Sequence, residues 1–380
     1  MKYYDLVIVT GEPFPIGKAA TNRILCYASK LAHTKRIAVY TWAALYGVDY
    51  KIAGRYLGVD YYYMQKPSKR PSKLNRLITL IIRYLKLYFF LILFSKSHSV
   101  LYVSRNVPMA LLIKLALSIK GVKMFREVSE VPTYTKNSLK KNLIMYSNKI
   151  YDGIIVISSS LGMLIGKFAR KRAKFFELPI LVYMDRFAAF DSIEKKKKLF
   201  YCSGGNVERD GLLDTLNGFL MFKKRTNDAE YTLEIATSLN LNDEYHKQVH
   251  RIIISNSDTI IYKGSLPTTE IPKLLTESSI LMMTPHENYK SKGFPTKLGE
   301  YFASGTPVIC SAIDDLKEQI TPDVVKFVEP NNVQDVCDAI IELVKDKEKA
   351  TAIGLRGRDW VIKKYTMDSY VDSMIEFLGI

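Results

Sequence analysis

Residues 292–309 read KGFPTKLGEYFASGTPVI, and this stretch carries most of the information about the fold. A glycine-bearing loop leads through Phe294 and Pro295 into an amphipathic helix, and residues 305–307 then turn the chain into an apolar strand. Proline at a helix start leaves free backbone N–H groups and the positive end of the helix dipole facing the loop. The stretch therefore predicts a helix N-terminus that binds an anion.

Two side chains of this predicted helix extend the anion site. Lys297 in the first turn supplies a mobile cation. Glu300, about one turn later, offers a carboxylate that accepts two hydroxyl hydrogen bonds, as from a ribose. The alternative is an ordinary amphipathic helix with a Lys297–Glu300 surface pair, which composition alone favours.

A second glycine loop lies further towards the N-terminus. Residues 203–211 read SGGNVERDG, follow a predicted strand and precede a predicted helix at residues 212–223. Gly204 and Gly205 let the backbone approach a ligand, and Arg209 is able to give two hydrogen bonds to a phosphate. Taken alone, a glycine loop of this kind is weak evidence for phosphate binding.

Short apolar runs alternate with helix-length amphipathic stretches along the whole chain, which is typical of parallel sheets with crossover helices. We expect strands at residues 5–10, 36–40, 99–103, 122–126, 153–157, 199–202, 231–235, 259–262, 280–283 and 307–310. We expect helices to begin near residues 19, 73, 107 and 139, after residue 158, at residue 212 and from residue 332 onward. The sequence therefore predicts an α/β protein of two doubly wound domains.

The expected boundary lies where this alternation stops. Residues 181–198 lose periodicity and end in consecutive lysines, which is typical of a solvated linker. We expect an N-terminal Rossmann-like domain at residues 1–180 and a C-terminal one at residues 199–362. A final helix at residues 363–380 is able to pack back on the N-terminal domain.

Composition limits the classes of partner. The formal net charge of +17 favours anionic partners such as phospholipid headgroups, nucleic acid or phosphorylated substrates. Zinc-finger, RNP and basic-zipper signatures do not occur, so we expect no nucleic acid. The cysteines have no paired spacing, and no Asp-x-Asp signature ends a strand, so we expect neither a metal nor another cofactor.

The apolar stretch at residues 77–94 is interrupted by Arg83 and Lys86, so we expect it to lie on a membrane surface. On a helix, one side collects Lys73, Arg76, Thr79, Arg83 and Lys86. No acidic residue occurs between Gln65 and Phe94, which favours an anionic leaflet. The alternative is a buried crossover helix with a solvated stripe.

Because the first residues read as a strand and not as a signal peptide, we expect a cytoplasmic protein, peripheral to the inner face of the plasma membrane.

The two motifs resemble the donor-binding region of glycosyltransferase family 4, which comprises retaining enzymes of the GT-B fold. Residues 292–309 resemble the variant signature Phe-Pro-Ser/Thr-Lys followed by Glu-Tyr, Ala-Ser-Gly and Pro-Val, and residues 203–211 resemble the glycine loop and basic Asp-Gly motif. Many members carry two glutamates separated by seven residues. Glu300 matches the second, whereas Lys292 stands where the first would be.

The resemblance implies roles for residues of both domains. Arg209 and Lys297 would stabilise the departing diphosphate. Residues 125–132 resemble a segment that faces the cleft, where Glu127 or Glu130 would orient an acceptor hydroxyl or act as base. The alternative for each glutamate is a structural role. The donor-binding residues would be Gly17, Gly204, Gly205, Gly293, Phe294, Pro295, Thr296 and Glu300.

The function implied by the resemblance is metal-independent, retaining sugar transfer in a GT-B fold, whose two Rossmann-like domains face a central cleft. The N-terminal domain would lie on the acceptor side, and the C-terminal domain would bind the nucleotide sugar. We therefore expect a hexosyltransferase that moves a hexose-type sugar from a nucleoside-diphosphate sugar to a lipid-linked glycan in surface polysaccharide synthesis. The alternatives are a non-catalytic nucleotide-sugar binder at the membrane surface, because the first glutamate is missing, and a GT-B nucleotide-sugar epimerase.

Overall fold

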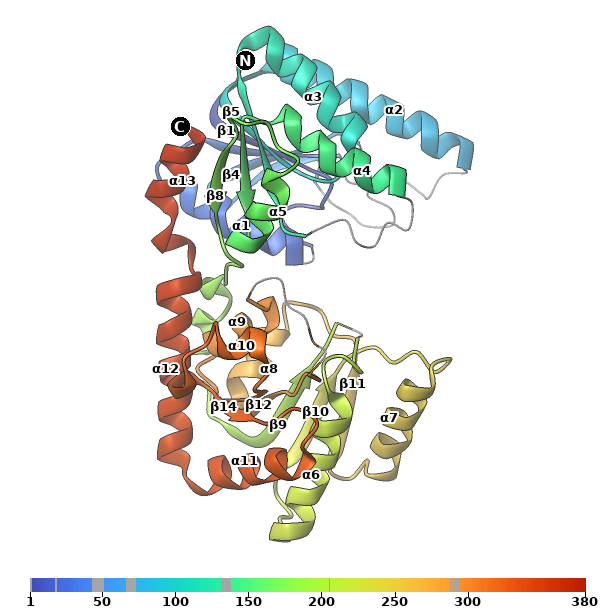
Figure 1. The fold of residues 1–380 in the computed structure, drawn as a ribbon, viewed down its shortest axis with the longest axis vertical. Coiled ribbons are helices and arrows are strands. Elements are labelled where there is room, and N and C mark those ends of the chain that lie inside the picture. The colour runs from blue at the N-terminus through green and yellow to red at the C-terminus, as the bar shows by residue number, and fades with distance from the viewer. Residues whose placement is uncertain are drawn as a thin grey trace. The chain divides into compact units, whose positions relative to one another are not determined.

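The computed structural model describes residues 2–17, 19–42, 51–65, 73–130, 138–204, 206–287, 289 and 294–380. The chain forms two compact units, and each is a sheet covered by helices (Figure 1). Unit 1 comprises Met1–Leu181 and Met367–Ile380, and unit 2 comprises Val182–Thr366. This architecture confirms the expected α/β fold with two Rossmann-like domains.

Unit 1 contains a sheet with the strand order β3-β4-β2-β1-β5-β6-β7-β8. Its strands are β1 (Lys2–Thr10), β2 (Ile37–Thr41), β3 (Ala53–Tyr56), β4 (Val59–Tyr63), β5 (Ser95–Val103), β6 (Lys123–Val128), β7 (Gly153–Val156) and β8 (Lys174–Glu177). Neighbouring strands run parallel except the β3–β4 hairpin, which is antiparallel. The helices are α1 (Ala19–Leu31), α2 (Lys73–Phe89), α3 (Val107–Lys120), α4 (Ser138–Tyr146), α5 (Ser159–Gly166) and α13 (Val371–Leu378).

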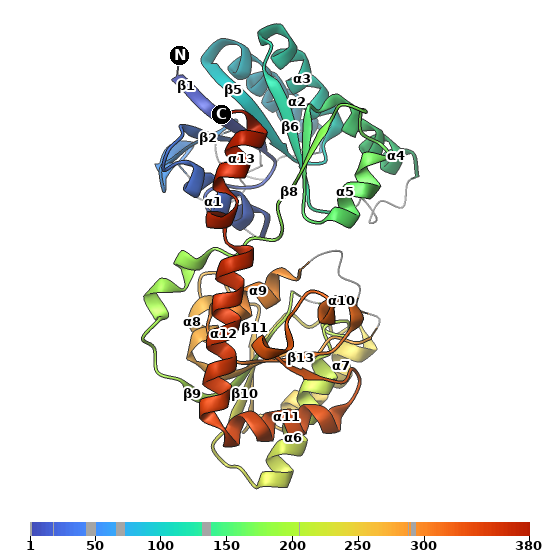
Figure 2. The same ribbon diagram turned by 60° about the vertical axis from the view of Figure 1, so that its left-hand side comes forward.

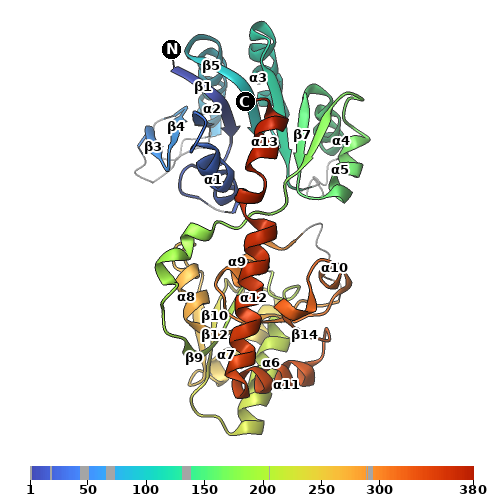
Figure 3. The same cartoon turned by 90° about the vertical axis from the view of Figure 1, so that its left-hand side faces the viewer.

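The core of unit 1 lies on both faces of this sheet. Val7 and Val9 of β1 pack in one cluster with Leu87 of α2 and Met109 of α3. The opposite face is covered by α1 and α13, which lie side by side (Figures 2 and 3). Phe377 of α13 packs against the sheet and holds the end of the chain on unit 1.

Local signals explain where several helices begin. Asn106 caps α3 by accepting a hydrogen bond from the Met109 N–H at 3.0 Å, and a proline occupies the first turn. Ser158 caps α5, and Asn332 caps α11 (Val333–Lys345) in the same way. These caps fix the helix starts at the positions where the sequence predicts them.

Unit 2 contains a parallel sheet with the strand order β11-β10-β9-β12-β13-β14. Its strands are β9 (Lys196–Cys202), β10 (Thr232–Ala236), β11 (Ile260–Gly264), β12 (Ser278–Met283), β13 (Val308–Ser311) and β14 (Lys326–Val328). One face packs against α6 (Leu212–Thr226), α7 (Glu244–Ser255) and α11. The other packs against α8 (Ile271–Glu277), α9 (Thr296–Ala303) and α12 (Lys347–Tyr365).

Most of the segment expected as a linker belongs to unit 2. The Val182 N–H donates to the Tyr365 carbonyl at 2.7 Å, and Phe187 is buried in the unit 2 core. The consecutive lysines at residues 195–198 lead directly into β9, where Lys198 is buried and ion-paired with Glu234 and Glu277. Aperiodicity in the sequence therefore marks irregular structure packed on unit 2.

Candidate functional site

The glycine loop after β9 ends at a buried carboxylate, Asp210, whose side chain is 4% exposed. Its Oδ2 accepts hydrogen bonds from Lys297 Nζ at 2.7 Å and from Ser203 Oγ at 2.6 Å. Its Oδ1 lies 3.2 Å from Arg209 Nη2. One carboxylate thus holds together the two cations that the sequence indicates for diphosphate binding.

This cluster keeps a net positive charge. Burial alone would raise the pKa of the Asp210 carboxyl, but Lys297, the Ser203 hydroxyl and Arg209 together lower that pKa below its usual value. Asp210 is therefore ionised at neutral pH, and two cations share one anion. The Arg209 side chain is 49% exposed, with its guanidinium 4.9 Å from the centre of the Tyr289 ring. It is thus oriented by its neighbours yet accessible to a phosphate.

Gly211 fixes the end of this loop. Its φ is +70°, and a Cβ at this position would lie 1.5 Å from the Thr284 carbonyl oxygen, so only glycine fits. The Thr284 hydroxyl in turn donates to the Gly211 carbonyl at 2.8 Å. Gly204 has the opposite environment, because a Cβ there would meet no heavy atom within 4 Å. Gly205 lies outside the described residues.

The second motif places α9 beside this loop. The sequence predicts Pro295 just inside the helix start, but the helix begins at Thr296, so Pro295 lies immediately before its first turn. No side chain caps this helix start, and Thr296 is exposed. Phe294 is buried and stacks on Tyr365 with ring centres 4.1 Å apart, which anchors the chain entering the helix. Gly293 lies outside the described residues.

Glu300 and Lys297 point to different partners. The Glu300 carboxylate is ion-paired with Arg186, whose Nη2 also donates to the Thr268 carbonyl at 2.5 Å. Because Lys297 pairs with Asp210, the Lys297–Glu300 surface pair is not the arrangement found. Glu300 is 24% exposed, and only one of its oxygens is in the ion pair with Arg186. A ligand hydroxyl therefore has an acceptor within reach.

Among the candidates in unit 1, Glu127 is held on both carboxylate oxygens. Oε1 is ion-paired with Arg23, and Oε2 accepts a hydrogen bond from the Tyr27 hydroxyl at 2.9 Å. The Arg23 guanidinium also donates to the Leu178 carbonyl at 2.7 Å. Glu127 thus ties α1 to the end of β6, and its geometry favours a positioning role.

Glu130 has more accessible surroundings, whereas Gly17 lies in a crowded part of the loop before α1. The Glu130 side chain is 54% exposed and pairs with Arg105 at 2.6 Å, so it is the more available of the two carboxylates. Gly17 lies close to α1, where a Cβ would come within 2.1 Å of the Thr21 hydroxyl oxygen. A larger residue at this position would therefore have to displace the Thr21 side chain.

Three residues of the unit 2 site were not selected from the sequence: Asp210, Arg186 and Tyr289. The signal for Asp210 is its place in the Asp-Gly pair that ends the glycine loop, directly after Arg209. Arg186 and Tyr289 have no comparable local signal, because each reaches its partner across the fold. Within the described residues, no three His, Cys, Asp or Glu side chains gather as a metal site.

Comparison with known proteins adds to this geometry. Residues 185–360, a little under half of the chain, match the family model described as Glycosyl transferases group 1. The GDP-mannose-dependent alpha-(1-6)-phosphatidylinositol monomannoside mannosyltransferase of Mycobacterium tuberculosis is 26% identical over 126 residues. This stretch is 32% of the present chain and spans only 33% of the mannosyltransferase.

Solved structures resemble the chain over nearly its whole length. Sucrose-phosphate synthase from Thermosynechococcus elongatus superposes with a TM-score of 0.68 at 12% identity, covering 98% of this chain and 97% of the other. HepE of Anabaena, in complex with UDP-glucose, gives a TM-score of 0.66 at 12% identity and covers 99% of both chains. The fold is that of the GT-B glycosyltransferases. Together with the family match in unit 2, it supports a glycosyltransferase.

Proposed function

We propose that this protein transfers a hexose-type sugar from a nucleoside-diphosphate sugar to a glycan acceptor, with retention of the anomeric configuration. The observation that carries the proposal is the Asp210 carboxylate, which holds Arg209 and Lys297 side by side. When the bond between the anomeric carbon and the phosphate oxygen breaks, negative charge grows on the diphosphate. Fixed cations at that position stabilise the transition state more than the ground state, and they do so without a metal ion.

The remaining site residues are given roles that fit their surroundings. Glu300 accepts hydrogen bonds from the ribose hydroxyls, with Arg186 setting its orientation. The loop at Gly204 and the helix start at Thr296 bring backbone N–H groups to the phosphates. In unit 1, Gly17 lies near the sugar and Glu130 orients the acceptor hydroxyl, with Glu127 supporting the end of β6. The proposed base of the donor nucleotide is guanine or uracil, because the mannosyltransferase is named for GDP-mannose and HepE was solved with UDP-glucose.

The acceptor side of the proposal places unit 1 on an anionic membrane, at the inner face of the plasma membrane. The helices concerned are α2, α3 and α4, which Figure 1 shows along one side of unit 1. Many of their large apolar side chains are about half exposed or more: Ile78, Ile81, Ile82, Leu85, Phe89, Leu111, Leu115, Ile119, Leu139 and Leu143. Exposed apolar patches of this kind mark membrane or partner surfaces. Within the described residues, no helix is long and apolar enough to cross a bilayer.

This surface differs from the basic stripe that the sequence predicts. Arg83, expected on the solvated side, is 6% exposed and donates to the Trp42 carbonyl at 3.0 Å. The Lys73 and Arg76 side chains lie outside the described residues. The apolar side of α2 therefore faces solvent, and its exposed cation Lys86 flanks it. The exposed apolar side chains would contact the acyl chains of the lipid, and the lysines would contact the headgroups.

The membrane part is tested by sedimentation with anionic and neutral vesicles. Replacing Ile81 and Leu115 together by Ser should weaken binding to anionic vesicles by about tenfold or more. Leu355→Ser on α12, which is similarly exposed, should leave binding unchanged. Equal binding by all three proteins would exclude this surface.

The catalytic part is tested by nucleotide release over a panel of nucleoside-diphosphate sugars, with and without lipid-linked glycan. Acceptor-dependent release of one nucleoside diphosphate supports the proposal. Binding without release would indicate the non-catalytic binder, and release or isomerisation without acceptor would indicate the epimerase. A role in surface polysaccharide synthesis is supported if the added sugar is found on a glycan that is a precursor of such a polysaccharide.

A further inference from the structure

A cavity of about 490 Å³ lies in unit 1 between helix α2 and the β3–β4 hairpin. Its walls include Ala53, Tyr62, Tyr63, Ile82, Leu85 and Phe89. The volume is within the ~300–1,000 Å³ usual for ligand pockets. Every lining residue belongs to unit 1, whereas the cation cluster of Arg209, Asp210 and Lys297 belongs to unit 2.

The walls of this cavity offer hydrocarbon and few polar groups. The Tyr62 hydroxyl lies 2.9 Å from the Tyr4 hydroxyl, and the Tyr63 hydroxyl donates to the Phe14 carbonyl at 2.9 Å. Both phenol groups thus have hydrogen-bond partners within the protein. A sugar in this cavity would lose hydrogen bonds to water and regain few of them, whereas an aliphatic chain loses nothing.

The α2 side of the cavity is open to solvent. Ile82, Leu85 and Phe89 are 45%, 48% and 52% exposed, although they are large apolar side chains. The core-facing side of α2 is already filled by the buried Arg83 and Leu87. The cavity is therefore not a packing defect of the core, and a chain entering it would cover apolar surface that now meets water.

The lining residues of this cavity include one cation and no carboxylate. Lys86 lines the cavity with an exposed side chain, and the sequence has no Asp or Glu from Tyr61 to Arg126. An anionic headgroup above the cavity would thus meet a cation without a neighbouring carboxylate in this stretch. This charge complementarity selects an anionic lipid from among the possible hydrocarbon ligands.

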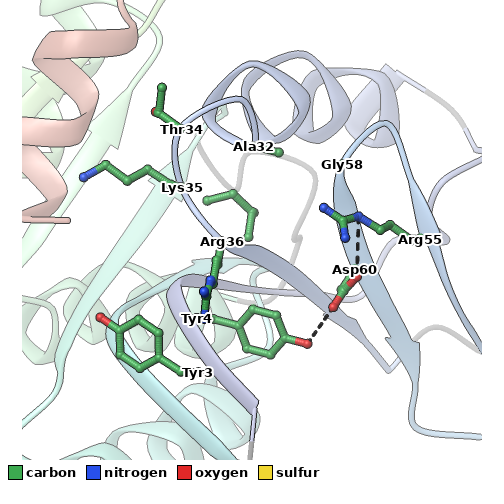
Figure 4. Close-up of a pocket in the computed structure, with 10 residues that line it drawn as sticks. Tyr3, Tyr4, Ala32, Thr34, Lys35, Arg36, Arg55, Gly58 and Asp60 are labelled. Atoms are coloured by element: carbon green, nitrogen blue, oxygen red, sulfur yellow. Dashed lines mark hydrogen bonds and ion pairs between the residues drawn. The ribbon is translucent and has the colours of Figure 1, made fainter.

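A second cavity in unit 1, of about 580 Å³, has the opposite chemistry (Figure 4). It is lined by Lys35, Arg36, Arg55 and Asp60, and the Asp60 carboxylate accepts a hydrogen bond from Tyr4 at 2.9 Å. Polar walls of this kind suit a polar ligand. The second cavity therefore provides a control for ligand chemistry within the same unit.

We propose that the α2 cavity holds one acyl chain of an anionic membrane phospholipid, with the headgroup phosphate at Lys86. The inference rests on the membrane-surface part of the proposed function and does not depend on sugar transfer. An acyl chain held in this cavity would fix the orientation of unit 1 on the membrane. The exposed apolar side chains of the helices alone would bind unit 1 to the membrane without fixing its orientation.

The test uses the full chain with vesicles that contain phosphatidylglycerol carrying a photoreactive diazirine near the end of one acyl chain. After irradiation, mass spectrometry locates the labelled peptides, which we expect at residues 52–64 and 82–90. Ala53→Trp fills the cavity and should lower this labelling by about tenfold, the loss expected when only two methylene groups are excluded. Ile81→Ser changes an exposed residue of α2 that does not line the cavity, and Arg55→Gln changes the polar cavity.

The variants separate the cavity from general membrane docking. We expect Ala53→Trp to keep vesicle sedimentation while losing label in the cavity, and Ile81→Ser to keep the cavity's share of the label on bound protein. Labelling spread over α2, α3 and α4 in the wild type, or unchanged by Ala53→Trp, would overturn the proposal even if sedimentation persists. Labelling by a photoreactive polyprenyl phosphate but not by the phospholipid would also overturn it, because the occupant would then be the acceptor lipid.

Discussion

Replacing Lys297 by methionine removes one cation of the unit 2 cluster and keeps most of the aliphatic stem. Lys297 Nζ lies 2.7 Å from Asp210 Oδ2, and the side chain is 23% exposed. The variant leaves Asp210 with Ser203 and Arg209 as partners, so the loop should keep its course. The main loss is then the interaction with the departing diphosphate.

The size of this loss follows from the electrostatics of the cluster. An ammonium about 4 Å from a phosphate charge interacts with about 4 kcal/mol at an effective dielectric constant of about 20. Asp210 shares the same cation and offsets part of this energy. We therefore expect Lys297→Met to lose about 2.7 kcal/mol of transition-state stabilisation, which is about 10²-fold in kcat/KM.

The assay is steady-state release of nucleoside diphosphate with the donor identified from the panel. Lys326→Met is the matched control, because Lys326 is 30% exposed and pairs with Glu342 at 2.5 Å. Lys326 is the first residue of β14, so the Lys326→Met variant should keep the wild-type kcat/KM. Arg209→Gln should behave like Lys297→Met. Wild-type turnover by both Arg209→Gln and Lys297→Met would refute the diphosphate role of the cluster.

Three further results are expected. Glu300→Gln should weaken nucleoside-diphosphate binding by about tenfold in calorimetry without changing the Tm, and unchanged affinity would leave Glu300 a structural role only. Gly211→Ala should lower the free energy of unfolding by about 3 kcal/mol or more, because its Cβ would collide with the Thr284 carbonyl oxygen. Gly264→Ala has a similar φ of +65° but open space, so it should cost only about 1 kcal/mol, and equal costs would contradict the collision. Finally, the lowered pKa of Asp210 means that its ionised form stabilises the fold above about pH 4, and that this contribution is lost as the pH falls through the folded-state pKa. Denaturant titrations should show the stability difference between wild type and Asp210→Asn shrinking in acid, and a constant difference from pH 7 to pH 3 would contradict this.

Local signals in the sequence were sufficient to predict most of the parallel strands and the starts of several helices. The helices expected to begin near residues 19, 73 and 107 begin at Ala19, Lys73 and Val107. The strands that were not expected, β3, β4, β8 and β14, are three to five residues long. β3 has little burial, so it leaves no apolar run in the sequence.

The side of α2 that faces solvent could not be read from periodicity. The sequence of α2 gives one side with cations and one apolar side, and periodicity alone predicts that the apolar side meets the sheet. The structure places Arg83 inward, where the Trp42 and Thr79 carbonyls accept its hydrogen bonds. Thr79 is one helical turn away, but Trp42 lies far from Arg83 in the sequence, and a partner of that kind is absent from any local pattern.

The candidate site shows the same division between local and long-range information. The two motifs identify Arg209, Lys297 and Glu300 because each motif is a continuous stretch of chain. The partners that orient these residues are Asp210 for the cations and Arg186 for Glu300. The contacts of Asp210 with Lys297 and of Arg186 with Glu300 join segments that are distant in the sequence. The sequence therefore indicates the candidate ligand-binding groups of unit 2, but it does not indicate which residues hold them in place.

The central claim is that unit 2 binds a nucleoside diphosphate between the glycine loop and the start of α9. Hydrogen–deuterium exchange with saturating UDP or GDP tests this claim most directly, because it locates the ligand without requiring the acceptor. We predict slower exchange in peptides that cover residues 203–211 and 294–302, and loss of that protection in Lys297→Met at the same nucleotide concentration. Nucleotide binding that leaves both segments unprotected, or that protects only unit 1, would contradict the account.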